Sequence, residues 1–570
     1  MTLYVFSAVL GVITFIGKNL HGTSQRIHSG PQRKTWIRMR IKKFGTLIVI
    51  ITLSLLSKPL YSQVLNDETF KIGRTIGLID AFYVDTVNLK SITEKAIVEM
   101  LRNLDPHSVY ISAKDVKEMN EPLNGNFEGI GIQFNLLRDS IIVIEPIPGG
   151  PSEKIGLKAG DRIITIDGEK VTGISISTSG VRQRLMGMKG TKVNIGVFRR
   201  GEKSILDFTI IRDKIPINSL DAAYMLDKET GYIKLNKFAA TTDKEFSEGL
   251  ERLKKGGMKN IIIDLRGNGG GFMLAATSLA DRFFPDKKLL VYLSGRKTPR
   301  QDYSSSGNGN LSSARIAILT DEGSASASEI LAGALQDWDR GVVIGRRTFG
   351  KGLVQNGFSL TDGSMIRLTV ARYYTPTGRL IQSPYNEGYE KYMQNFFKRY
   401  TGGELMSADS IHFPDSLMFK TLVNKRTVYG GGGIMPDVFV AADTSDYSEY
   451  YRGLVRRGIL TSFALEYFDK NRKLLTAEYK NFDDYKARFE FSPDDIGELI
   501  KKAGNAGINY DGNQFSVSRK EILMILKGLV ASNLWQLNEY YRIVNEDDIV
   551  IEKALKVLSD ISAYAKILGY

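Results

Sequence analysis

The sequence predicts a multidomain α/β protein, and three observations support this prediction. The chain has 570 residues, whereas one hydrophobic core rarely serves more than about 250 to 300 residues. Between residues 231 and 345, apolar strand-like runs alternate with helix-like segments, which is typical of an α/β core. Between residues 125 and 213, short β-branched runs are separated by glycine and proline turns, which indicates a compact β-rich domain.

The N-terminal residues 1–62 predict a targeting region. They carry nine Lys and Arg residues and no acid, and the basic run ending at Lys43 precedes the apolar stretch 45–57. This order is typical of a secretory signal, and 13 apolar residues are short for a membrane span. We expect cleavage near Ser62, with a retained anchor as the alternative. Because Met39 begins a complete signal, we expect residues 39–62 to be the signal and residues 1–38 a mis-assigned start.

The composition excludes several functional classes. With 42% hydrophobic and 25% charged residues, the chain is neither disordered nor a polytopic membrane protein. It has no cysteine, which excludes disulfides, thiolate metal sites and cysteine nucleophiles. With only four histidines, we expect no metal and no cofactor. The net charge of +14 falls to +5 without the first 62 residues, so we expect no nucleic-acid partner.

Four further segments follow the targeting region. Residues 63–115 place Ile72, Ile76 and Ile79 at helical spacing, and we expect a small helical module there. The β-rich domain is expected over 116–213, and the α/β core over 214–440 with an insertion at 385–427 whose role is not assigned. Residues 441–570 are expected to be helical. We expect that region to mediate oligomerisation or to bind a partner such as an adaptor protein.

The β-rich domain contains two glycine motifs, GIGI at 129–132 and GLKAGDRIITIDG at 156–168. Glycines let backbone N–H groups converge on a carboxylate, while the adjoining strand edge accepts an extended peptide. Taken alone, GIGI also fits a plain β-turn. Together, the motifs resemble a PDZ domain, which implies recognition of protein C-termini. The peptide-binding residues would be Gly129, Ile130, Gly131, Ile132 and Phe134, with residues 182–185 on the facing helix.

A glycine turn ends a buried strand at residues 261–271, IIIDLRGNGGG. Its backbone N–H groups are free to face a negative charge at the start of the next helix. The dinucleotide fingerprint fails, because Phe272 stands where the third glycine is required. We therefore interpret the turn as a candidate site for a reaction oxyanion.

Two more segments carry candidate catalytic groups. In GSASASE, residues 323–329, small side chains permit a turn that exposes a hydroxyl at a helix N-terminus; simple N-capping is the alternative. In residues 347–355, Lys351 lies between two glycines after an apolar strand, so it is a candidate desolvated amine; a solvated surface lysine is the alternative. Gly352 stands where a phosphate loop needs Ser or Thr, so we reject nucleotide binding.

These segments together resemble the carboxyl-terminal processing peptidases, or tail-specific proteases, which are serine peptidases with a serine–lysine dyad. The similarity covers about residues 66–440 and includes LDPHSVYI (104–111), ARYYTPTGRLIQ (371–382) and GGGIMPDVFV (431–440). It implies a ClpP/crotonase-like α/β peptidase core with an inserted PDZ domain. The residues that it implies are the nucleophile Ser326, the base Lys351, Gln355 to position the lysine, and an oxyanion hole from Ala327 and either Gly270 or Gly271.

The chemistry agrees with this assignment. A lysine base near neutrality needs its pKa lowered by about 3 units, or roughly 4 kcal/mol, and burial can supply this. We expect His107 to be structural. The sequence thus predicts an exported, periplasmic endopeptidase that binds protein or peptide substrates by their C-termini. The alternatives are a non-catalytic PDZ scaffold and an acyl-processing enzyme of crotonase-like architecture.

Overall fold

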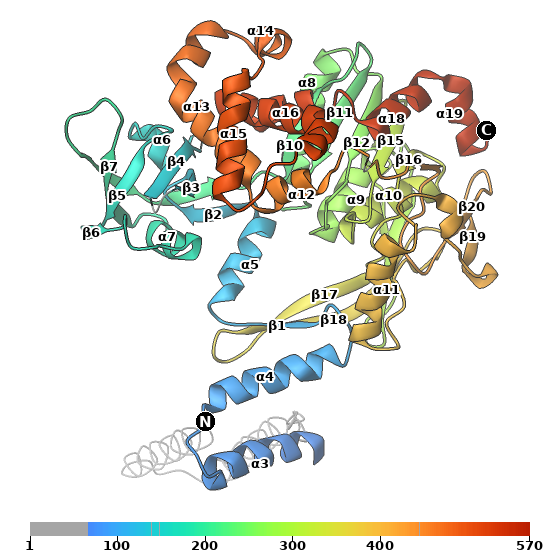
Figure 1. Ribbon diagram of the computed structural model, residues 1–570. Helices are drawn as coiled ribbons and strands as arrows, with labels where there is room; N and C mark the ends of the chain where they lie inside the picture. The colour runs from blue at the N-terminus through green and yellow to red at the C-terminus, as the bar shows by residue number, and fades with distance from the viewer. Residues whose placement is uncertain (1–66, 138–139, 148, 444) are drawn as a thin grey trace, which may run out of the picture. The chain divides into compact units, whose positions relative to one another are not determined.

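The computed structural model describes residues 67–137, 140–147, 149–443 and 445–570 (Figure 1). These described residues fall into two units, with the division after residue 93. The predicted targeting region, 1–62, lies outside the described residues. No helix within the described part of the chain is long and apolar enough to cross a membrane.

The N-terminal unit contains helix α3 (Asp67–Phe82) and the start of α4 (Leu89–Arg102). The expected helical character is confirmed, but α3 buries none of its residues. Ile72 is 45% exposed and Phe82 is 80% exposed. The apolar spacing therefore predicts the helix correctly, although none of its apolar residues is buried within the described part of the chain.

A six-stranded sheet forms the α/β core in the order β10-β11-β12-β15-β16-β21. Its strands are β10 (Leu220–Met225), β11 (Thr230–Leu235), β12 (Asn260–Asp264), β15 (Arg315–Thr320), β16 (Val342–Gly345) and β21 (Val438–Phe439). All are parallel except β10. Every residue of β12 is buried, as expected for a continuous apolar run covered on both faces.

Helices cover both faces of this sheet (Figure 1). One face packs against α8 (Thr242–Lys255), α9 (Met273–Asp281) and α10 (Ala327–Asp337). The other packs against α18 (Ile549–Ser559) and α19 (Ile561–Leu568). Helices α18 and α19 are therefore part of the α/β core, although the sequence predicts a separate helical region there.

A second sheet carries the segment after Lys351. It contains β1 (Val109–Ile111), β13 (Leu289–Ser294), β14 (Gln301–Ser304), β17 (Leu353–Ser359) and β18 (Met365–Tyr374). β17 and β18 form an antiparallel hairpin, and β1 adds to the other edge of β18, with Val109 opposite Arg367. This pairing brings the LDPHS motif to the hairpin that follows Lys351.

The predicted PDZ region folds around the sheet β3-β4-β5-β7-β8, with β6 paired to β5. Its elements are β3 (Ile132–Leu137), β4 (Ser140–Pro146), α6 (Pro151–Lys154), β5 (Arg162–Ile166), β6 (Glu169–Lys170), α7 (Thr178–Leu185), β7 (Lys192–Phe198) and β8 (Leu206–Ile211). Strands β2 (Asn126–Gly129) and β9 (Asp213–Pro216), which pair with each other, lead into and out of it. Helix α5 (Asp115–Asn124) precedes β2.

The insertion contains one long helix, and the C-terminal region is mainly helical. The insertion holds α11 (Tyr389–Thr401), two short 3-10 turns (Ala408–Ser410 and Asp415–Leu417), β19 (Met418–Lys420) and the start of β20 (Thr427–Tyr429). The helices that follow are α12 (Glu449–Arg456), α13 (Ile459–Glu478), α14 (Phe482–Arg488), α15 (Pro493–Asn505), α16 (Gly512–Leu534) and α17 (Leu537–Val544). α12 to α16 enclose an aromatic-rich core of their own. The predicted fold class is confirmed.

Candidate active site

The three serines of the SASAS run lie in different environments at the start of α10. Ser324 and Ser328 are fully buried, and their hydroxyls donate to Leu265 O and Asn268 O, each at 2.8 Å. Ser326 is only half-buried and has φ +56° and ψ −112°, a backbone conformation that is costly for a residue with a Cβ. The outer serines thus bind the turn to the glycine segment, and the middle one is the most accessible of the three.

The glycine turn lies directly against Ser326. A Cβ on Gly270 would come within 2.8 Å of Ser326 Cβ and 2.9 Å of Ala327 N, so only glycine fits there. The N–H of Gly270 donates to Asn268 Oδ1 at 2.9 Å. Within the described residues, the N–H groups of Gly271 and Ala327 have no acceptor. Ala327 is the first residue of α10, where such an unpaired donor is expected.

Lys351 lies in the loop between β16 and β17. Its Nζ donates to Gln355 Oε1 at 3.2 Å, and Gln355 Nε2 donates to the carbonyl of His107. Burial lowers the pKa of Lys351 below its usual 10.5, and the charge of Arg367 lowers it further. The structure therefore brings Lys351 and Gln355 together and favours a desolvated amine over the solvated surface lysine of the alternative interpretation.

Glu329 joins the serine segment to the lysine loop. Its Oε2 accepts hydrogen bonds from the backbone N–H groups of Ser326 at 2.7 Å and Lys351 at 2.9 Å. Its Oε1 accepts from the Thr348 hydroxyl at 2.6 Å and from the Gly350 N–H at 2.8 Å. Burial raises the pKa of this carboxyl to about 7, against the opposing effect of the donated hydrogen bonds. From sequence alone, Glu329 is interpreted only as part of a helix cap. Glu329 does bind the N–H of the cap residue, Ser326, but it also binds the lysine loop through Gly350 and Lys351.

Tyr373 of β18 links the same two segments. This side chain is buried, and its hydroxyl lies within hydrogen-bonding distance of two carbonyl oxygens, Ser326 O at 3.0 Å and Lys351 O. Burial raises the pKa of its phenol well above 10, so it stays a donor over the physiological range. Its only sequence signal is its place in the ARYYTPTG motif.

His107 reaches the site through the pairing of β1 with β18. Its Nε2 lies 3.2 Å from Tyr392 Oη, and its carbonyl binds Gln355. Burial, followed by the charge of Lys351, lowers the pKa of His107 to about 4. His107 is therefore neutral near pH 7. The sequence interpretation of His107 as structural overlooked its closeness to Lys351, which the separation of 244 positions along the chain concealed.

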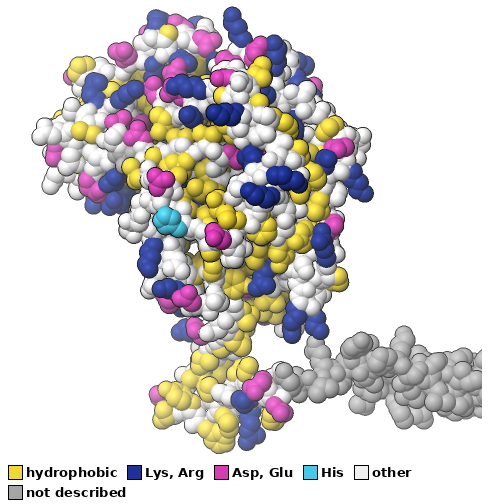
Figure 2. All heavy atoms as spheres, turned by 90° about the vertical axis from the view of Figure 1, so that its right-hand side faces the viewer, with side chains coloured by type: hydrophobic (Ala, Val, Ile, Leu, Met, Phe, Trp, Pro, Cys, Tyr) yellow, Lys and Arg dark blue, Asp and Glu magenta, His cyan; other side chains and the backbone are white. Residues whose placement is uncertain are grey.

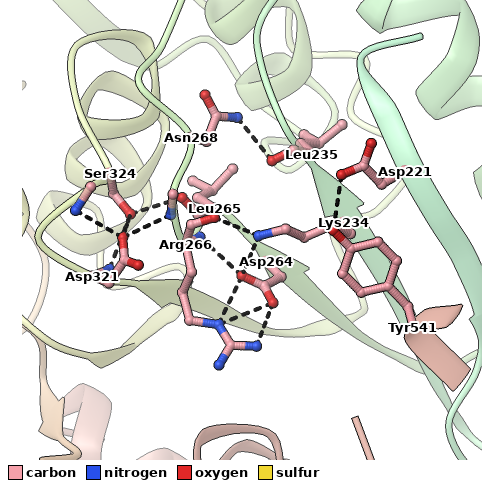
Figure 3. Close-up of polar contacts among 12 residues, drawn as sticks. Asp221, Lys234, Leu235, Asp264, Leu265, Arg266, Asn268, Asp321, Ser324 and Tyr541 are labelled. Atoms are coloured by element: carbon pink, nitrogen blue, oxygen red, sulfur yellow. Dashed lines mark hydrogen bonds and ion pairs between the residues drawn. The ribbon is translucent and has the colours of Figure 1, made fainter. Parts of the chain in front are cut away.

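A network of charged side chains surrounds the start of the glycine turn (Figure 3). Asp264, at the end of β12, binds Arg266 at 2.6 Å and Lys234 Nζ at 3.2 Å. Lys234 Nζ also donates to Arg266 O at 2.5 Å. Asp321 Oδ1 accepts the N–H groups of Gly267 at 2.9 Å and Gly323 at 3.0 Å. The glycine turn and the serine turn thus share fixed anchors.

The predicted peptide-binding residues of the PDZ region lie around the start of β3. Ile130 and Ile132 are 2% and 9% exposed, in the same core cluster as residues of α7, while Phe134 is partly buried against it. Gly131 has φ +72°, and a Cβ there would meet Ile215 at 2.8 Å. The N–H groups of Ile130 and Gly131 have no acceptor within the described residues.

No group of three or more His, Asp and Glu side chains in the described part of the chain has the arrangement of a metal site.

Comparisons with known proteins identify related families. A sequence model of peptidase family S41 matches residues 229–388, a PDZ-domain model matches 129–210, and a family of unknown function matches 450–536. Carboxy-terminal processing protease CtpB of Bacillus subtilis is 35% identical over 314 residues, which cover 55% of this chain and 65% of CtpB. The chain thus spans just under two thirds of that relative. A carboxyl-terminal-processing protease of Picosynechococcus is 34% identical, over 55% of this chain and 76% of that protein.

Among solved structures, the photosystem II D1 C-terminal processing protease is 32% identical, over 56% of this chain and 85% of that chain, with a TM-score of 0.33.

Proposed function

This chain belongs to the carboxyl-terminal-processing proteases of peptidase family S41, and we propose that it is a serine endopeptidase with a Ser326–Lys351 dyad. The observation that carries the proposal is the pair of hydrogen bonds to Glu329 Oε2 from Ser326 N and Lys351 N. These bonds support the proposal, because they tie the backbone of the half-buried serine and that of the lysine of lowered pKa to one carboxylate oxygen.

The proposed reaction proceeds through an acyl-enzyme. Neutral Lys351 takes the proton of the Ser326 hydroxyl as its oxygen bonds to the scissile carbonyl carbon. When the C–N bond breaks, Lys351 returns that proton to the leaving amine. Water then attacks the ester carbonyl, gives a proton to Lys351, and releases the new C-terminus as Ser326 regains its hydrogen. Gln355 Oε1 accepts from Lys351 Nζ, so it orients the amine.

The oxyanion hole is proposed to consist of the N–H groups of Ala327 and Gly271. Both lack acceptors within the described residues, whereas the N–H of Gly270 is occupied by Asn268 Oδ1. Gly270 instead provides the close approach of the turn to Ser326. Preorganised donors of this kind stabilise the developing charge without reorganisation.

The PDZ domain is proposed to hold the substrate by its C-terminus. The unpaired N–H groups of Ile130 and Gly131 would bind the terminal carboxylate, while the edge of β3 takes the chain by strand addition. Removal of the substrate's carboxylate charge by amidation should then weaken binding, and Gly131→Ala should weaken it as well, because the glycine's positive φ and close packing exclude a Cβ.

The test is degradation of an unstructured protein with an apolar, carboxylate-terminated tail by residues 63–570. Ser326→Ala and Lys351→Ala should each abolish cleavage while circular dichroism stays unchanged, and Lys398→Ala, at an exposed lysine, is the matched control. If the unmutated protein bound the tail but never cut it, in the presence of candidate adaptors as well, the non-catalytic PDZ scaffold would replace the peptidase.

Export to the periplasm is also proposed, on the basis of the signal-like residues 39–62. N-terminal sequencing of the protein recovered from a periplasmic extract should find a start near Gln63. A chain that retained Met39 in the cytoplasmic fraction would contradict this part of the proposal.

A further inference from the structure

Helix α11 of the insertion packs one face against the loop that carries Lys351. The side chains of Tyr392, Phe396 and Arg399 point inward at intervals of four and three residues, the spacing of one helix face. The neighbouring Phe397, which is 60% exposed, lies on the outer face. Figure 2 looks onto the side of the molecule that bears α11, where hydrophobic side chains are interspersed with charged ones.

Arg399 binds three consecutive carbonyls just before Lys351. Its guanidinium donates to Arg347 O at 2.8 Å, Thr348 O at 2.9 Å and Phe349 O at 3.3 Å. Residues 347–352 belong to no helix or strand. The bonds from Arg399 therefore pair backbone carbonyls that a helix or sheet would pair with backbone N–H groups. Arg399 itself is only 8% exposed.

Glu404 supplies the charge partner that a buried guanidinium needs. Its carboxylate accepts a hydrogen bond from Arg399 Nε at 2.8 Å. It also accepts from Arg347 Nε at 2.7 Å and from Arg347 Nη2 at 2.6 Å. The insertion therefore brings an arginine and a carboxylate that together fix the backbone on the N-terminal side of Lys351.

The same helix also reaches the side-chain partners of Lys351. The ring of Phe396 lies 4.9 Å from that of Phe349, and Tyr392 Oη contacts His107 Nε2. The carbonyl of His107 accepts from Gln355, which in turn accepts from Lys351 Nζ. α11 thus touches both the backbone before the lysine and the chain of contacts that orients its amine.

We propose that Arg399 is a positioning residue for Lys351, and that α11 is part of the active site. This inference rests on the proposed role of Lys351 as the base. The match to the S41 family ends at residue 388, so the family match assigns nothing to this helix. Without Arg399 the loop would loosen and admit water to the amine. Because burial is the main cause that lowers the pKa of Lys351, hydration would raise it again and leave less neutral amine at pH 7.

Arg399→Gln tests the proposal, with Lys398→Gln as the matched control: the same helix and charge change, on the exposed side. Two quantities are measured in the full chain. One is amide hydrogen exchange of the peptide that spans residues 345–355, which needs no turnover. The other is the pH profile of kcat and KM for cleavage of a fluorogenic peptide.

For Arg399→Gln we expect faster exchange in that peptide and an acidic limb of kcat shifted upward by about one pH unit, which is about tenfold less activity at pH 7 with KM little changed. Lys398→Gln should show neither change. Faster exchange with an unshifted pH profile would mean that Arg399 only stabilises the loop, and it would overturn the proposal, as would unchanged exchange.

Two further controls keep the outcome clear. If Arg399→Gln does not fold, Glu404→Gln, which keeps the arginine and removes its charge partner, is judged by the same criteria. If the unmutated protein cleaves nothing, the proposed function fails on its own, and the exchange measurement alone then decides whether Arg399 holds the loop.

Discussion

Glu329 and Lys351 are joined by a hydrogen bond of 2.9 Å from the lysine's backbone N–H to Glu329 Oε2. The same oxygen accepts the N–H of Ser326. One buried carboxylate therefore holds the start of α10 next to the loop after β16. The proposed nucleophile and base come from segments 25 positions apart, so their alignment depends on this contact.

Glu329→Gln should lower both stability and activity. An amide keeps one acceptor oxygen but presents an NH₂ group to backbone donors that now bind a carboxylate, leaving buried N–H groups unpaired. We expect a loss of about 1–3 kcal/mol in the free energy of unfolding and a marked drop in kcat. Denaturant unfolding and peptide cleavage measure the two effects. Glu248→Gln, at a side chain 60% exposed, is the control, and an unchanged kcat would contradict the role of Glu329.

The activity should rise with pH until Lys351 is neutral, at a midpoint below the usual 10.5 because burial lowers its pKa. The charge of Arg367 contributes to that lowering, so Arg367→Gln should move the midpoint to higher pH. Rate profiles between pH 5 and 10 test this. Arg372→Gln removes the same charge from β18, at a side chain that donates to Tyr385 Oη, and should leave the midpoint in place. Equal shifts in both variants would indicate a net-charge effect only.

His107 should make the protein sensitive to acid. Its pKa is lowered to about 4 from 6.5, so the folded state favours the neutral ring. The resulting stability is present above pH 6.5 and is lost as the pH falls through about 4. A shift of this size corresponds to about 3 kcal/mol.

Unfolding free energies measured at several pH values test this sensitivity. His107→Gln, which cannot take up a proton, should lack this part of the acid dependence. If the unmutated chain and the variant lost stability in parallel between pH 6.5 and 4, the ring would not be the titrating group.

Ser326→Gly should be more stable than Ser326→Ala, although both remove the proposed nucleophile. The backbone at φ +56° strains any residue with a Cβ, and glycine relieves that strain by about 1 kcal/mol. At the exposed helical position 398 the order should reverse, since glycine is there about 1 kcal/mol worse than alanine. Equal stability of the two variants at position 326 would show that the serine turn is not strained.

The sequence predicts the elements of the site that local pattern determines. The apolar residues 261–263, followed by a glycine turn, predict a buried strand and its turn. The small residues around Ser326 predict an accessible hydroxyl. The middle serine becomes distinct only in three dimensions, because Ser324 and Ser328 bind carbonyls of the glycine segment.

Contacts made by distant segments could not be predicted. Arg399 and Tyr373 reach the lysine loop from an insertion and a hairpin. His107, just before β1, binds Gln355, the side-chain partner of Lys351. An amphipathic pattern does not determine which surface a helix packs against. The same holds for α18 and α19, which are read as a separate helical region from sequence but cover the central sheet.

This packing predicts that a chain ending at residue 545 will not stay soluble. Such a chain loses α18 and α19 and uncovers apolar residues of β12, β15 and β16, including Ile262, Leu319 and Ile344. Each large aliphatic side chain returned to water costs about 1.5–3 kcal/mol. Truncation within the C-terminal region therefore cannot test oligomerisation by itself, and the soluble fraction after expression measures the effect.

A point substitution tests the contribution of the ion pair between α18 and Arg266 separately from that of the apolar packing of α18 and α19 on the sheet. Asp548 caps α18 by accepting the N–H groups of Val550 and Ile551, and its other oxygen binds Arg266, just before the glycine turn, at 2.7 Å. Asp548→Asn keeps a good cap but removes the charge. Because both side chains are about one-fifth exposed, we expect a loss of about 1–2 kcal/mol in stability. Asp547→Asn, at a 55% exposed neighbour, should change the free energy of unfolding little. Equal losses in the two variants would show that the contact with Arg266 does not contribute to stability.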